Sequence, residues 1–191
     1  MLNEDIQKII TELERSLDSK RFAHTMGVAY TAACIAMRYD YDMNRAYLAG
    51  LLHDCAKCLS HSKRLEYCKK NNIPVTDTET ANPALLHAKV GADMCNRKYG
   101  IEDDEIYNAV LYHTTGHPNM SMLDKIIYIA DYIEPNRCEA PNLENVRKQT
   151  FTDLDTALCT ILSDCVKYLE SSSKAIDPMT IQTYQFYINQ E

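Results

Sequence analysis

Several features are missing from this 191-residue sequence. No stretch approaches the ~18 apolar residues of a membrane span. Tryptophan is absent, only five glycines occur, and no apolar–polar alternation is long enough to predict a sheet. There is no basic excess either, because a net charge of −7 argues against a non-specific nucleic-acid binder. The acidic, periodic start resembles neither a signal peptide nor a transit peptide. We therefore expect a cytoplasmic protein with neither nucleic acid nor membrane as a partner.

The cysteine pattern gives little support for a zinc finger. Of the eight cysteines, only Cys55 and Cys58 form a close pair, and no second pair or Cys–His group stands at zinc-finger spacing. In a reducing compartment these residues are thiols, and most of them suit the role of small apolar fillers. A structural zinc or a redox role for the pair remains the weaker alternative.

What the sequence does contain is helical periodicity over nearly its whole length. The first helix places Ile6, Ile9, Leu13 and Leu17 on one face. No repeat or inter-domain linker is visible, so we expect one all-α domain over residues 1–191. The expected helices span residues 5–17, 20–38, 46–55 after an Asn44 cap, 62–70, 83–98, 102–113, 121–134, 143–170 and 178–189, with residues 71–83 as the longest loop.

Four histidines occur on or beside the apolar faces of different predicted helices: His24, His53, His87 and His113. Any one of them, taken alone, is more simply explained as a satisfied core or cap histidine. Burying four imidazoles without partners costs about 1–3 kcal/mol each, however, and one shared metal site satisfies several of them together.

Two carboxylates complete the pattern. Asp54 follows His53 at the end of an apolar helix, and Asp131 lies among isoleucines, where a charged group should be paired or ligating. Nitrogen and oxygen ligands without thiolate suit divalent Fe, Mn, Co or Zn. We predict a first metal at His24, His53, Asp54 and Asp131. Asp54 could bridge to a second metal reached by His87 and His113, unless those two histidines bind phosphate directly.

These residues resemble a known family. The order His24, His53-Asp54, Asp131 on successive helices is similar to the signature of HD-domain metal-dependent phosphohydrolases. The segments LAGLLHDCAK (48–57) and HTTGHPNMSMLDKIIYIADYIEPNR (113–137) resemble the YqeK-type branch, the bacterial, symmetrically cleaving diadenosine tetraphosphate hydrolases. The resemblance implies an all-α HD domain with its core at about 20–135 and C-terminal helices at about 143–189 packed on it. It also implies iron at the first metal position, a homodimer, and hydrolysis of a dinucleoside tetraphosphate to two nucleoside diphosphates.

The C-terminal segment matches this branch only in part. It keeps the Pro-x-Thr element at Pro178 and Thr180, which makes Thr180 a candidate substrate contact. It has Tyr184-Gln185 where the family pattern has Arg-Asn.

Several residues near the predicted ligands are suited to bind phosphate. Lys57 lies four residues after His53, Arg21 lies three residues before His24, and Arg137 follows the helix of Asp131. An arginine can bind phosphate through two parallel hydrogen bonds. Thr114 can add a hydroxyl contact, and we assign the catalytic roles to Asp54 and Lys57. The simpler alternative for the three cations is a solvated surface position.

Other functions remain open from the sequence alone. The same metal site could act on a nucleoside monophosphate, a cyclic nucleotide or another signalling nucleotide. The protein could also be an adaptor with a structural metal, or a nucleotide sensor without turnover. An open coordination position argues against a purely structural metal, because structural sites are usually closed.

Overall fold

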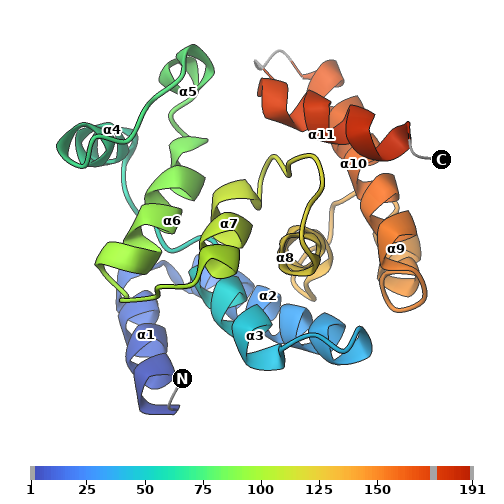
Figure 1. The fold of residues 1–191 in the computed structure, drawn as a ribbon, viewed down its shortest axis with the longest axis horizontal. Coiled ribbons are helices and arrows are strands. Elements are labelled where there is room, and N and C mark those ends of the chain that lie inside the picture. The colour runs from blue at the N-terminus through green and yellow to red at the C-terminus, as the bar shows by residue number, and fades with distance from the viewer. Residues whose placement is uncertain (1–2, 173–175, 190–191) are drawn as a thin grey trace.

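The helices of this protein are described here from a computed structural model, which covers residues 3–172 and 176–189. Over that part of the chain the regular secondary structure is entirely helical, which confirms the all-α prediction (Figure 1). The helices are α1 (Asn3–Ser16), α2 (Ser19–Arg38), α3 (Met43–Leu52), α4 (His61–Lys70), α5 (Asp77–Ala81), α6 (Leu86–Arg97), α7 (Asp104–Tyr112), α8 (Met122–Ile133), α9 (Leu143–Thr150), α10 (Leu154–Ser171) and α11 (Pro178–Ile188).

Most helices begin directly after a short polar side chain that accepts backbone N–H groups of the first turn. Such a cap satisfies donors that have no partner within the helix. The capping residues are Asp18, Asp42, Ser60, Thr76, Asp103, Ser121, Asp153 and Asp177.

The structure differs from the sequence prediction around α3 and in the loop after α4. Asp42, and not Asn44, caps α3, and the helix ends at Leu52 before it reaches the His53-Asp54 pair. The predicted loop 71–83 contains the short helix α5, which a reciprocal capping box stabilises.

The single helix predicted over 143–170 is wrong, because the chain folds there into α9 and α10. Asp153 accepts hydrogen bonds from the backbone N–H and the hydroxyl of Thr156, so a new helix begins after it. The carbonyl of Phe151, at the end of α9, accepts a hydrogen bond from Arg38 Nε of α2 at 2.9 Å. Tertiary contacts therefore satisfy groups that a continuous helix would have used.

Helix α8 lies at the centre of the structure and packs against α2, α3, α7, α9 and α10 (Figure 1). Its isoleucines are almost completely buried. Helices α2 and α3 also pack very closely, since a Cβ added to Gly50 would lie 2.7 Å from Ala29 Cα. Figure 1 shows α4 to α6 on one side of this centre and α9 to α11 on the other. Residues that lie far apart in sequence are thereby brought together around α8.

Among the described residues, no helix combines the length and the apolar character needed to cross a membrane.

Candidate metal centre and substrate cavity

The His53-Asp54 pair lies in the turn that follows α3. His53 is completely buried, and its Nδ1–H donates to the carbonyl of Gly50 at 2.7 Å. That bond assigns the proton to Nδ1 and leaves a lone pair on Nε2. His53 Nε2 is buried without a hydrogen-bond partner, 3.6 Å from Asp54 Oδ2 and 3.9 Å from Asp131 Oδ1. A buried nitrogen acceptor that faces two carboxylates fits a metal ligand.

His24 of α2 and Asp131 of α8 close the same cluster from the other side. His24 Nε2 lies 3.0 Å from Asp131 Oδ1 and 4.0 Å from Asp54 Oδ2. Its other nitrogen, Nδ1, is 3.1 Å from Oε1 of Glu134, which is buried at the end of α8. Ligand atoms of His24, His53 and Asp131 lie within 4.8 Å of one another. The structure thus brings together all four residues predicted for the first metal.

His87 of α6 and His113 at the end of α7 form a second group. Each donates its Nδ1–H to a backbone carbonyl three residues earlier, that of Ala84 at 2.6 Å and that of Val110 at 2.8 Å. Their Nε2 atoms are 3.1 Å apart, and they lie 3.2 and 3.4 Å from Asp54 Oδ1. Two neutral imidazoles with Nε2 lone pairs this close repel each other, so the arrangement favours a positive charge between or beside them.

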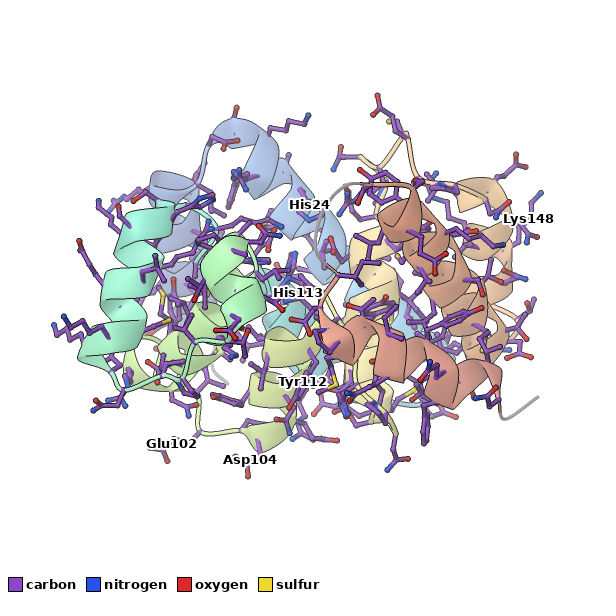
Figure 2. All side chains as sticks on the ribbon, turned by 90° about the horizontal axis from the view of Figure 1, so that it is seen from above. His24, Glu102, Asp104, Tyr112, His113 and Lys148 are labelled. Carbon is purple, nitrogen blue, oxygen red and sulfur yellow. The ribbon has the colours of Figure 1, made fainter. Side chains whose placement is uncertain are left out.

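The four histidines share one orientation, with Nδ1 bound to an acceptor and Nε2 turned towards the carboxylates. Figure 2 labels His24 and His113 near the middle of the molecule. The ring centroid of His53 lies 5.4 Å from that of His24 and 5.1 Å from that of His113. Metal-ligating histidines are typically fixed in this way by an acceptor on the second ring nitrogen. The residues present therefore fit a divalent metal.

The ionisation of the cluster agrees with that fit. Burial lowers the pKa of His53 to about 4 and also lowers the pKa of His87, so both rings are neutral near pH 7. Burial alone would raise the pKa of Asp54 and of Asp131, but the neighbouring histidines outweigh it and hold both below the usual range. For His24, burial lowers the pKa and the hydrogen bond to Asp131 raises it, with a net rise. Ionised carboxylates beside the neutral rings of His53 and His87 make a site for a cation.

The predicted phosphate-binding residues line a cavity of about 1070 Å³ that opens beside this cluster. Lys57 Nζ lies 3.0 Å from Asp54 Oδ2, although α3 has ended and the contact is made within the turn. Arg137 donates to Asp131 Oδ1 at 2.9 Å. Arg21 is exposed and paired with Asp18, while Thr114 also lines the cavity. The structure thus brings these four residues to the wall of one cavity.

Thr180 is not part of the cavity wall in the described structure. It is buried in α11, which packs against the segment after α7. Tyr187 Oη accepts the backbone N–H of Met120 at 2.7 Å, and a Cβ on Gly116 would lie 2.7 Å from Thr183 Cγ2. Helix α11 thus packs against the segment formed by His113 to Met120.

The remaining histidines and acids have local roles. His117 Nε2 bonds Asp124 Oδ2 at 3.0 Å, and Asp124 forms a capping box with Ser121 at the start of α8. His61 is exposed at the start of α4. Cys55 is buried against the carbonyl of Gly91, so its contacts suit an apolar filler.

Two residues that hold parts of this cluster in place were missed by sequence reasoning. Glu134 accepts from His24, and only its place just before Pro135, at the end of an apolar helix, could have drawn attention to it. Arg64 is buried and donates to the carbonyls of Ala56, Lys57 and Pro83 at 3.4, 3.0 and 3.4 Å. It braces the His53-Asp54 turn against the start of α6, and its sequence context carries no signal of this.

Comparison with known proteins agrees with this site. Residues 21–136 match the HD domain, so the chain belongs to the HD-domain family. Three relatives are each described as a bis(5'-nucleosyl)-tetraphosphatase, symmetrical. The protein of Bacillus subtilis (strain 168) is 36% identical over 93% of this chain and 94% of its own length. That of Halalkalibacterium halodurans is 38% identical over 93% of this chain and 94% of its own. That of Staphylococcus aureus is 32% identical over 96% of this chain and 94% of its own.

A solved structure also matches over almost its entire length. The crystal structure of a predicted HD superfamily hydrolase involved in NAD metabolism, from Clostridium acetobutylicum, superimposes with a TM-score of 0.92 at 38% identity. The match covers 97% of this chain and 98% of that one. The HD resemblance recognised in the sequence is thereby confirmed, and with the His/Asp cluster it indicates a divalent-metal site.

Proposed function

We propose that this chain is a metal-dependent hydrolase that cleaves diadenosine tetraphosphate symmetrically into two molecules of ADP. One observation carries the proposal. A buried cluster of imidazoles and carboxylates opens onto a cavity whose wall holds Lys57 and Arg137. The chain also matches symmetrical tetraphosphatases over nearly its whole length.

The chain offers two adjoining places for a cation. His24, His53, Asp54 and Asp131 would hold the first ion, and Asp54, His87 and His113 would hold a second. Asp54 faces both, because Oδ2 is the oxygen near His53 and Oδ1 the oxygen near His87. A divalent metal in such a site would lower the pKa of a bound water to near neutral pH. The metal would also polarise a phosphoryl oxygen.

The chain's own contribution is positioning and charge neutralisation. Attack by water on one of the two inner phosphorus atoms breaks its bond to the central bridging oxygen, and ADP leaves with that oxygen. In this proposal Lys57, beside Asp54, and Arg137, beside Asp131, would bind the oxygens of the attacked phosphate and of the departing diphosphate. Because ADP is a good leaving group, little general-acid assistance is required, and Arg21 and Thr114 are left for substrate binding.

The identity of the metal is a finer part of the proposal. We propose iron, with manganese, cobalt or zinc as alternatives. The donor set of nitrogen and oxygen without thiolate supports this group of metals.

We further propose one HD domain over the whole chain, a homodimer and a cytoplasmic location. A hydrophobic core that is continuous from Ile9 to Tyr187 supports one domain. The exposed Tyr30 and Met37, seven residues apart on α2, offer an apolar surface for a second copy. The eight cysteines, which form no disulfide in the described part of the chain, suit a reducing compartment. Sedimentation equilibrium tests the dimer.

Product analysis tests the reaction. Metal-loaded protein is incubated with diadenosine tetraphosphate, and the digest is separated by ion-exchange chromatography. ADP as the sole nucleotide product is expected. ATP with AMP would indicate asymmetrical cleavage, and release of inorganic phosphate alone would indicate a different phosphohydrolase; either result contradicts the proposal.

A further inference from the structure

The walls of the substrate cavity differ in charge from one helix to the next. The cavity wall contains four cations. Two of them, Lys20 and Arg21, come from α2, while Lys57 lies in the turn after α3 and Arg137 in the segment after α8. The wall that α10 contributes contains no cation. A ligand with an anionic part and a neutral part is therefore oriented by this cavity.

The wall from α10 is built by one face of that helix. Ile161, Asp164, Cys165 and Tyr168 follow the spacing i, i+3, i+4, i+7, which places them on one side of a helix. Helix α8 supplies Tyr132 to the same cavity, one residue beyond Asp131 of the metal cluster. The aromatic side of the cavity thus begins directly next to the metal cluster.

The two tyrosines differ in how they are held. Tyr132 Oη donates to the carbonyl of Pro141 at 2.9 Å, which fixes its ring in the wall. Tyr168 is 64% exposed, the most exposed of the large apolar side chains described. A large aromatic ring left in solvent at the mouth of an enzyme cavity is a ready surface for another ring to stack on.

We propose that the α10 side of the cavity is a nucleobase subsite in which the base of the substrate stacks on Tyr168, with Tyr132 as part of the wall. The proposal rests on the proposed nucleotide substrate and adds the residue that binds its neutral part. The nucleobase is the uncharged, flat part of such a substrate, and stacking on an aromatic side chain tolerates different bases.

The charges on the α10 wall favour a neutral group there over a phosphate. Asp164 is buried in that wall, and Asn142 Nδ2 donates to its two carboxylate oxygens at 3.0 and 2.9 Å. Asn142 is a neutral partner, whereas Asp54 and Asp131 on the other wall are each paired with a cation, Lys57 and Arg137. A phosphate chain is therefore better accommodated beside Lys57 and Arg137.

The test compares two ligands that share a diphosphate and differ in the base. Binding of ADP and of inorganic pyrophosphate to metal-loaded protein is measured by calorimetry for wild type, Tyr168→Ala and Tyr168→Phe. Phe151→Ala is the matched control, because Phe151 is an aromatic side chain that is 41% exposed at the end of α9 and outside the cavity. We expect Tyr168→Ala to weaken ADP binding about tenfold or more and to leave pyrophosphate binding within about twofold. Tyr168→Phe keeps the ring and should bind ADP like wild type, as should Phe151→Ala.

The outcomes separate this inference from the proposed function. Unchanged ADP affinity in Tyr168→Ala, or an equal loss for ADP and pyrophosphate, overturns the subsite. If ADP binding depends on Tyr168 but diadenosine tetraphosphate is not cleaved, the subsite stands and the proposed reaction falls. If cleavage occurs and Tyr168→Ala leaves ADP binding unchanged, the subsite alone is wrong.

Discussion

Gly27 of α2 allows the Glu134 carboxylate to reach His24, and Gly27→Ala tests that arrangement. An added Cβ would lie well inside van der Waals contact of Glu134 Oε2 and 3.2 Å from Asn136 Nδ2. The carboxylate would have to move, although it is buried and accepts three hydrogen bonds, from Asn136 N, Asn136 Nδ2 and His24 Nδ1 at 2.8, 2.9 and 3.1 Å.

The magnitudes decide the sign of the effect. Alanine is favoured over glycine within a helix by about 1 kcal/mol. A hydrogen bond to a charged group contributes about 1.5–3 kcal/mol, so losing even one of the three offsets that gain. Losing two would destabilise the fold by about 2–5 kcal/mol net. Since Glu134 orients a predicted metal ligand, metal affinity should also fall about 10- to 100-fold.

Gly91→Ala in α6 is the matched control. A Cβ there meets Val110 Cγ1 at 3.4 Å and Cys55 Sγ at 3.5 Å, which is ordinary packing contact. Manganese affinity is measured by competition with a fluorescent chelator, and the stability of metal-free protein by thermal unfolding. We expect the loss of affinity in Gly27→Ala only. Equal metal affinities in the two variants would refute the reasoning that Glu134 holds His24 for the metal.

Three further predictions concern the metal cluster directly. Burial lowers the folded-state pKa of His53 from about 6.5 to about 4, so metal-free protein should lose up to about 2 kcal/mol of stability between pH 7 and pH 5 at this residue. The raised pKa of His24 has the opposite sign, so the test is the difference between wild type and His53→Gln in urea unfolding at both pH values; no difference in slope would contradict it. In a steady-state assay, Lys57→Met should lower kcat/KM about 100-fold, and Lys57→Arg should recover part of that loss. Equal kcat/KM values for wild type and Lys57→Met would mean that Lys57 is a solvated surface residue without a role in the reaction. The double variant Cys55→Ser, Cys58→Ser should retain its full metal content by elemental analysis, and loss of metal would instead support a thiolate site.

The local pattern of the sequence predicts which side chains gather in this cluster, because each of them is unusual at its position in a helix or turn. Asp131 among isoleucines and His53 at the end of an apolar helix are costly to bury alone, and the structure brings them together with His24 and Asp54. The all-α class follows from the helical spacing of apolar residues, because the buried face of each helix is visible in that helix's own sequence.

What the sequence does not predict depends on contacts between distant segments. Arg64 binds backbone carbonyl groups, and the sequence carries no signal of such contacts. Thr180 is predicted to contact substrate, whereas in the described structure it is buried in α11 and does not line the cavity. The break between α9 and α10 depends on the cap at Asp153 and on a bond from α2. Tyr168 could not be selected among 13 tyrosines until α8 and α10 had been placed around one cavity.

The most direct test of the central claim is an anaerobic titration of metal-free protein with ferrous iron, followed by metal content and by the rate of ADP formation from diadenosine tetraphosphate. The account predicts that the rate rises in proportion to bound iron, and that His53→Ala neither binds the metal nor forms ADP. Cleavage that proceeds without metal, or wild-type iron binding in His53→Ala, would contradict the assignment of this cluster as the metal centre.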